Sequence, residues 1–148
     1  SVDEDLGFLP GTIEEKMAPW TRPVMDVLLE YFYSYEIESM LREGVIELAP
    51  LAFMRGRNFV DAFVIAEEIQ CATESQVKML LTRLSSGSKM VITGDLRQAD
   101  RGDENGLLDF CNRIKDKQLK HIDIVVFDVK DVERHNAVKE VLRLYGEE

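Results

Sequence analysis

Cysteine, basic charge and long apolar runs are all scarce in this sequence. The two cysteines, Cys71 and Cys111, have no histidine or cysteine partner at metal-ligand spacing, which indicates neither a disulfide framework nor a zinc site. Eighteen basic side chains stand against twenty-eight acidic ones, and the net charge of −10 disfavours broad, non-specific binding to nucleic acid. No apolar run approaches the length of about 18 residues that spans a bilayer. We therefore expect a cytoplasmic chain with no membrane partner.

The length of 148 residues, with 45% hydrophobic content, suffices for one core and is too short for two ordinary domains. We expect residues 1–148 to form a single domain. Short apolar runs rich in Val, Ile and Phe predict strands at 45–49, 62–66, 89–93 and 122–127. Continuous runs of this kind are typical of a parallel sheet that helices cover on both faces.

Helical periodicity fills the stretches between these runs. The clearest helix follows a capping box from Thr73 to Gln76, and Gly87 is its expected stop signal. Another helix should begin near Pro23, and a shorter one should end at Gly44. The last two helices are expected at 106–114 and 136–145.

The N-terminal stretch 8–23 holds three of the four prolines, and we expect a surface loop there with one short helix. Strands that alternate with helices favour an α/β doubly wound sheet. In such sheets ligands bind beyond the carboxyl ends of the strands.

Carboxylates stand where two of the predicted strands end. Glu67 and Glu68 follow the strand at 62–66, while Asp95 and the amide of Gln98 follow the strand at 89–93. One carboxylate could hold a hydrated Mg²⁺ and another could orient an attacking water, as phosphoryl transfer requires. Because parallel strands end at one edge of a sheet, both clusters should face one crevice. The alternative is that these are solvated acids at strand ends.

Segments spread along the whole chain resemble those of PhoH-like proteins, a family of P-loop ATPases related to the superfamily 1 helicases. In order, the matching segments are GFLPG with EEK near the start, APLAFMRGR at 49–57, FVIAEEIQ at 63–70, MLLTRL at 79–84, SKMVITGD with Gln98, and DVERH at 131–135. This resemblance implies a RecA-like P-loop NTPase fold, a three-layer sandwich with a mostly parallel sheet. It also implies ATP and Mg²⁺ as the cofactors of the complete domain.

The resemblance assigns roles to residues at the two strand ends. It makes Glu67 and Glu68 the Walker B pair, with Glu67 as the Mg²⁺ ligand and Glu68 as a catalytic residue. Asp95 and Gln98 become the sensor motif that reads the γ-phosphate. Two further residues, Gln70 and Thr93, are implied to contact the nucleotide.

The Walker B pair departs from the family pattern, which usually has aspartate before glutamate, whereas this chain has Glu67. The extra methylene moves the carboxylate by roughly 1.3 to 1.5 Å, about one C–C bond, which alters the expected metal geometry.

Three arginines are implied to be catalytic: Arg55 and Arg57, on either side of Gly56, and Arg134 in DVERH. An arginine near the γ-phosphate stabilises the charge of the transferred group. The alternative for each arginine is a surface salt bridge, in a chain with 28 acidic residues.

Other residues are expected to serve structure. His135 is predicted to be a structural partner, because no catalytic relay of the serine or cysteine type is visible around it. Met54, Tyr31, Tyr33 and Tyr35 fall on or beside apolar helical faces, which favours a core or interface position over a base-stacking platform.

The phosphate-binding motif GxxxxGK[ST] occurs nowhere in these residues. In the family that loop lies upstream of GFLPG, together with the first strand and helix, so we expect this chain to begin after it. Without the N–H cradle and its lysine, the chain has little with which to hold a polyphosphate. We therefore expect it to bind neither ATP nor Mg²⁺ tightly.

The first functional prediction is a PhoH-like ATP-binding protein, an ATPase when an upstream Walker A loop completes it. RNA remodelling is the coupled work that the resemblance suggests, although no RNA-binding motif is legible in the sequence. The alternative is a degenerate, non-enzymatic module of the same fold that binds a partner or forms oligomers. Without the P-loop strand, the strand at 89–93 would have an unpaired edge, which either the strand at 122–127 or a second chain should fill. We also expect a homo-oligomer.

Overall fold

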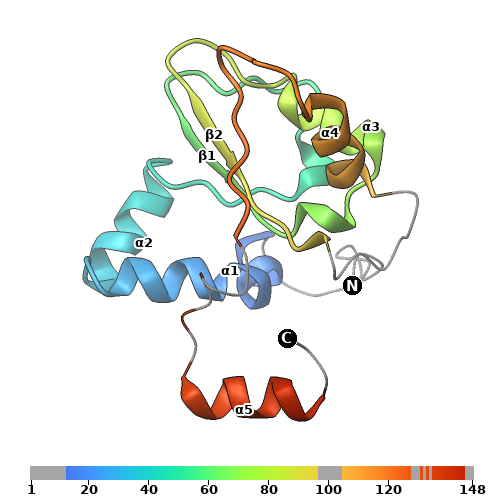
Figure 1. The fold of residues 1–148 in the computed structure, drawn as a ribbon. Coiled ribbons are helices and arrows are strands. Elements are labelled where there is room, and N and C mark those ends of the chain that lie inside the picture. Colours follow the sequence, from blue (N-terminus) through green and yellow to red (C-terminus); the bar gives the residue numbers. More distant parts are fainter. Residues whose placement is uncertain (1–12, 97–104, 128–130, 132, 134, 146–148) are drawn as a thin grey trace. The chain divides into compact units, whose positions relative to one another are not determined.

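The computed structural model describes residues 13–96, 105–127, 131, 133 and 135–145. The chain divides into two compact units, Ser1–Arg113 and Ile114–Glu148. Helices and strands alternate in the first unit, which is therefore an α/β fold (Figure 1). No helix in the described part of the chain is long and apolar enough to cross a membrane.

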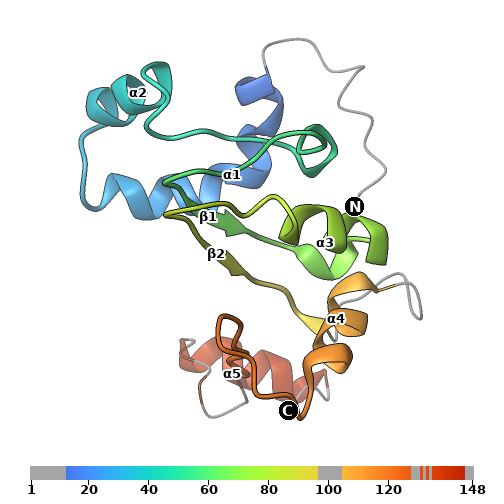
Figure 2. The same cartoon turned by 90° about the horizontal axis from the view of Figure 1, so that it is seen from above.

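A parallel pair of strands organises the first unit. Strand β1 spans Phe63–Ala66 and strand β2 spans Lys89–Ile92, with Phe63 opposite Lys89 and Ala66 opposite Ile92 (Figure 2). These strands confirm two of the four predicted from apolar runs. Because the pair is parallel, both strands end at the same edge of the sheet.

Helix α3, Glu74–Leu81, connects the two strands and confirms the predicted capping box. Thr73 Oγ1 accepts a hydrogen bond from Gln76 N at 3.3 Å, and Gln76 Oε1 accepts one from Thr73 N at 2.8 Å. The helix ends well before Gly87, which was expected to stop it. The chain leaves the helix early because Leu84 forms a parallel bridge with Phe59.

The first helix begins earlier in the chain than the sequence predicted. Helix α1 runs without interruption over Ile13–Leu29, so the separate helix expected from Pro23 is wrong. A proline inside a helix forfeits one backbone hydrogen bond, and α1 continues through Pro23 despite that loss. Helix α2, Ser34–Arg42, was predicted correctly, and Gly44 follows it with φ of +73°.

Two predicted strands are absent from the described residues. Val45 N and Ile46 N both donate to Met40 O, at 2.8 and 3.1 Å, so the start of segment 45–49 closes the end of α2. Segment 122–127 is extended but has no strand assignment. Its residues Val125, Val126 and Phe127 are 75 to 80% exposed. The sheet among the described residues is therefore small, with two strands.

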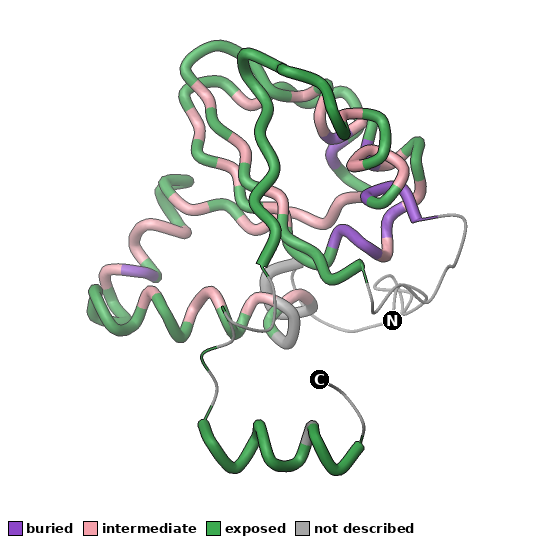
Figure 3. Tube along the Cα trace, in the orientation of Figure 1, coloured by how far each residue is buried: buried purple, intermediate pink, exposed green. Residues whose placement is uncertain are grey.

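The core lies on one face of this sheet. Buried apolar side chains come from α3, from helix α4 (Gly106–Ile114) and from the loops around them: Met54, Ile69, Ala72, Val77, Leu80 and Leu107. Ala66, Met90 and Ile92 of the two strands pack against this cluster. Along both strands burial alternates, as Figure 3 shows. The opposite face exposes Phe63, Ile65 and Val91 at 64%, 52% and 37%.

The second unit contains helix α5, Asn136–Leu144, as the sequence predicted. His135 precedes it and accepts a hydrogen bond at Nδ1 from Ala137 N, at 3.2 Å. Val138 N donates to His135 O at 2.8 Å. His135 thus serves as a structural partner at the first turn of the helix, as predicted.

Candidate functional site

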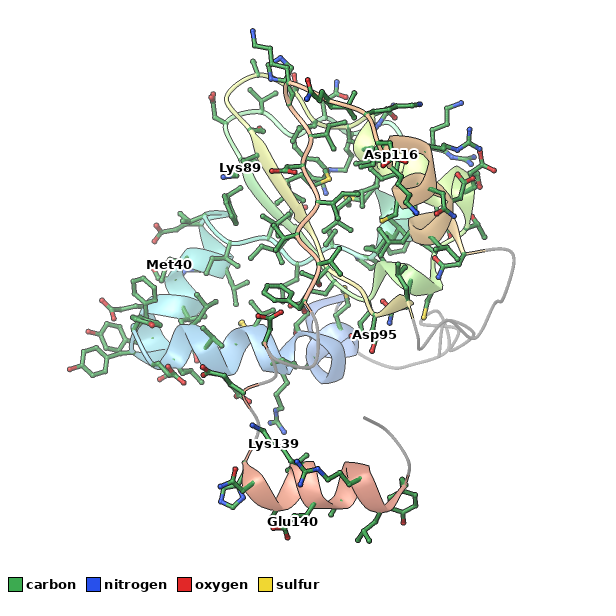
Figure 4. The ribbon with its side chains drawn as sticks, viewed as in Figure 1. Met40, Lys89, Asp95, Asp116, Lys139 and Glu140 are labelled. Carbon is green, nitrogen blue, oxygen red and sulfur yellow. The ribbon has the colours of Figure 1, made fainter. Side chains whose placement is uncertain are left out.

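The carboxyl ends of β1 and β2 form the candidate site. Glu67 and Glu68 follow β1, and Thr93 and Asp95 follow β2. Backbone hydrogen bonds continue past the strands: Thr93 N donates to Ala66 O at 2.9 Å, and Ile69 N donates to Thr93 O at 3.2 Å. Figure 4 shows Asp95 beyond the end of β2. Glu67, Glu68 and Asp95 therefore lie at one edge of the sheet, as the sequence predicted.

Glu68 has an unusual backbone, with φ of 57° and ψ of 32°. Non-glycine residues seldom adopt this left-handed conformation, because it is strained. Residues with such strain are found preferentially at functional sites. It turns the chain from β1 into the short 3₁₀ helix Ile69–Cys71, whose last residue donates from Cys71 N to Glu68 O at 3.3 Å. The turn directs the chain back beneath the strand ends and leaves the Glu68 side chain exposed.

Gln70 joins the two strand ends through its side-chain amide. It is only 2% exposed. Its Nε2 donates to Glu68 Oε2 at 2.8 Å, and its Oε1 accepts from the backbone N–H of Asp95 at 3.3 Å. The amide that the resemblance assigned to nucleotide contact is thus engaged at both ends within the protein. It fixes the position of Glu68 relative to the loop after β2.

Two glycines allow the close packing around Gln70. A Cβ on Gly94 would lie 2.7 Å from both Gln70 Oε1 and Leu107 Cδ2, so any other residue here would displace one of these side chains. Gly106 N donates to Ala72 O at 2.9 Å, and a Cβ there would lie 2.4 Å from Thr73 O. These contacts hold the start of α4 against the turn that carries Gln70.

Asn105 is a structural residue of the site that the sequence reasoning missed. It is 2% exposed, and its Oδ1 accepts from Leu107 N and Leu108 N, both at 3.0 Å. Its Nδ2 has no hydrogen-bond partner among the described residues. The sequence could have predicted this role, because asparagine directly before an apolar helical pattern is a common helix N-cap.

The exposed carboxylates at this edge are side chains of the kind that could hold a hydrated magnesium ion. No three His, Cys, Asp or Glu residues of the described chain gather as a metal cage. Mg²⁺ does not need one, because it keeps several waters and binds through one or two carboxylates and the substrate phosphates. Glu67 and Asp95, both exposed, suit that role.

The predicted arginines lie in different surroundings. Arg57 forms a two-pronged ion pair with Glu47, in which Nη2 lies 2.9 Å from Oε2 and Nη1 contacts Oε1. The hydrogen bond from Arg57 lowers the pKa of Glu47, and the same bond raises the pKa of Arg57. Arg55 is exposed in the adjoining turn, where Gly56 has φ of +81°. Gln98 and Arg134 lie outside the described residues.

The chain is similar in sequence to several proteins that carry the name PhoH. The PhoH-like protein of Bacillus subtilis (strain 168) is 43% identical over 150 residues, which cover 98% of this chain and 46% of that protein. The PhoH-like protein of Mycobacterium tuberculosis (strain H37Rv) is 44% identical over 145 residues, covering 97% and 41%. Protein PhoH of Escherichia coli (strain K12) is 42% identical over 149 residues, covering 98% and 42%.

The chain therefore spans less than half the length of the relatives that it matches. A family model described as PhoH-like protein matches residues 1–146. With this match over nearly its whole length, the chain belongs to the PhoH-like protein family.

Proposed function

We propose that the edge formed by β1 and β2 is the metal- and water-positioning part of an ATP-hydrolysing site of the RecA-like P-loop kind. One observation carries this proposal: Glu68 and Asp95 follow the carboxyl ends of neighbouring parallel strands, and the buried amide of Gln70 joins them. Ligands of open α/β sheets bind beyond the carboxyl ends of the strands, which is where this pair lies.

Each residue has a distinct task in this proposal. Glu67 would hold Mg²⁺ through water, and the ion would supply neutralising positive charge to the phosphates. Glu68 Oε2 is occupied by Gln70 Nε2, while Oε1 has no hydrogen-bond partner in the described part of the chain. Oε1 is therefore the oxygen that can accept a proton from an attacking water.

Residues after β2 read the phosphate end of the nucleotide. Thr93 and Asp95 are exposed beside Glu68 and can contact the γ-phosphate or its metal. Gln98 and the arginines Arg55, Arg57 and Arg134 remain candidates by resemblance alone. Arg57 would have to exchange its partner Glu47 for a phosphate, which the exposure of this ion pair permits.

The charge at the edge limits what these residues do unaided. Carboxylates repel a polyphosphate, and these 148 residues contain no GxxxxGK[ST]. The chain alone should bind ATP no tighter than about 1 mM. The activity belongs to a protein in which a phosphate cradle meets this edge.

A second function is favoured by a separate observation. The face of the sheet away from the core exposes three neighbouring apolar side chains, Phe63, Ile65 and Val91, and grouped exposed apolar residues are typical of interaction sites. A module that binds a partner or a second copy through this face would account for that exposure. Light scattering over a range of concentrations tests self-association through this face, because a chain that is monomeric throughout excludes it.

Calorimetry tests the first function. The product of the complete reading frame should bind ATP at micromolar concentration with Mg²⁺ present. Glu67→Gln should lower the apparent affinity for Mg²⁺ in that complex by roughly tenfold or more. Glu140→Gln, an exposed change on α5, is the matched control and should have no effect. If the 148 residues alone bind ATP at micromolar concentration, or if Glu67→Gln and Glu140→Gln behave alike, the proposal is wrong.

A further inference from the structure

An exposed aromatic cluster lies where α1 turns into α2. Tyr31, Phe32, Tyr33 and Tyr35 are 76%, 41%, 71% and 66% exposed. Of the two positions expected for the tyrosines, core or interface, the exposure excludes the core. Single exposed apolar residues are ordinary, but a group of neighbouring aromatic rings is typical of an interaction site. We call these four residues the aromatic surface.

The aromatic surface is held in a defined shape. The rings of Tyr33 and Tyr35 stack, with centroids 5.7 Å apart and planes 9° from parallel. Tyr33 N donates to Glu36 Oε2 at 2.8 Å, which fixes the first turn of α2 beneath the rings. Phe32 N donates to Leu28 O at 2.9 Å and holds the other side of the turn to α1. Because the turn is already ordered, ligand binding carries little entropic cost for ordering it.

A shallow hollow adjoins these rings and has an acidic rim. Phe32, Tyr35 and Met40 supply its apolar lining, and Figure 4 labels Met40 on α2. Glu36, Glu38 and Glu43 line the same hollow, and Glu30 lies next to Tyr31 in the sequence.

The basic side chain in this hollow is already engaged. Arg42 Nη2 donates to Ser39 Oγ at 3.1 Å, and that hydroxyl donates to Glu43 Oε1 at 2.7 Å. The hollow therefore presents apolar rings beside three carboxylates and one arginine, so acidic side chains outnumber basic ones in its lining.

We propose that the aromatic surface is a docking site for a basic, arginine-containing segment of a partner protein. Guanidinium groups stack on tyrosine faces and form two-pronged hydrogen bonds with carboxylates, so one arginine can use both features of the site. The same rim repels a phosphate backbone, which argues against single-stranded RNA even though stacked aromatic rings could hold bases. This inference is independent of the strand-edge site.

Fluorescence anisotropy tests it with a short labelled peptide that alternates arginine with leucine. The control peptide has glutamate at each arginine position. The basic peptide should bind the chain, and the double variant Tyr33→Ala with Tyr35→Ala should weaken binding by at least about tenfold. The double variant Glu30→Gln with Glu38→Gln should weaken it by roughly three- to tenfold and reduce its dependence on salt. These tyrosines are exposed, so circular dichroism should show the fold unchanged.

Matched variants elsewhere separate this site from general charge attraction. Tyr145→Ala removes a tyrosine that is 80% exposed, and Glu140→Gln removes an exposed carboxylate on α5. Neither should change the affinity by more than about twofold. If these controls weaken binding as much as the site variants do, or if the glutamate peptide binds equally well, the proposal is overturned.

Three further measurements would assign the surface to another occupant. Binding of a labelled oligouridine that the tyrosine variant abolishes would make it an RNA site. A solution mass that rises with concentration, and stops rising in the tyrosine variant, would make it a contact between copies. Failure of the complete gene product to bind the peptide, while the 148 residues bind it, would mean that another segment covers the surface. Each result contradicts the docking site, and peptide binding to both proteins supports it.

Discussion

Gln70 Nε2 lies 2.8 Å from Glu68 Oε2, so a buried amide holds one oxygen of an exposed carboxylate. The other end of the same amide accepts from the backbone of Asp95 at 3.3 Å. The position of the carboxylate after β1 thus depends on the loop after β2.

Replacing Gln70 by alanine should lower the free energy of unfolding by about 2 to 3 kcal/mol, because it leaves a cavity and deprives Asp95 N–H of this bond. Urea denaturation measures the change, with Gln118→Ala, an exposed glutamine, as the control. A loss for Gln70→Ala no larger than that for Gln118→Ala would show that the amide does not hold the two strand ends.

Glycine substitutions should rank by what the new Cβ meets. Gly106→Ala should cost the most, above about 2 kcal/mol, since its Cβ would approach the backbone atom Thr73 O to 2.4 Å. Gly94→Ala should cost roughly 1 to 3 kcal/mol, because Gln70 Oε1 must move. Gly44→Ala meets nothing within 4 Å and carries only the strain of its positive φ, about 1 kcal/mol. Thermal or urea denaturation of the three variants gives the order, and an inverted order would contradict the close packing at the site.

The Glu47–Arg57 pair should make a small, pH-dependent contribution to stability. The pKa of Glu47 is lowered from 4.5, chiefly by the hydrogen bond from Arg57. A carboxyl group with a depressed folded-state pKa stabilises above its unfolded value and loses that contribution as pH falls through the folded value. The difference in melting temperature between the natural chain and Glu47→Gln should therefore be present at pH 7 and vanish at strongly acidic pH. Because the pair is exposed, the difference should be about 2 °C or less. A difference that grows as pH falls would have the wrong sign.

The Cys111 thiol should react slowly, because burial raises its pKa. In a Cys71→Ser variant, alkylation by iodoacetamide at pH 8 should proceed at least about fivefold more slowly in the folded chain than in urea, since the thiolate is the nucleophile. Equal rates in the two states would mean that Cys111 is not shielded by α4 and the core.

Sequence reasoning succeeded where a pattern has a single physical meaning. The apolar runs of β1 and β2 and the Thr73 capping box predicted elements that the structure contains. Because the strands are parallel, the rule for their carboxyl ends also brought Glu68 and Asp95 to one edge.

It failed where the same residues can serve two purposes. Val45 and Ile46 have strand-forming side chains, but their N–H groups close the end of α2. A proline before a helical pattern predicts the start of a helix, but α1 continues through Pro23. The left-handed backbone of Glu68 and the bridging role of Gln70 leave no mark in a sequence pattern, since both depend on the loop after β2.

In the proposed site, Glu68 positions the water that attacks ATP. The most direct measurement is the rate of ATP hydrolysis by the product of the complete reading frame, for the natural protein and for Glu68→Gln, with Glu140→Gln as control. We predict that Glu68→Gln lowers kcat by at least about 100-fold while ATP binding persists, because a general base is lost and the phosphate contacts remain. If Glu68→Gln hydrolyses ATP as fast as Glu140→Gln does, the strand edge is not the catalytic site.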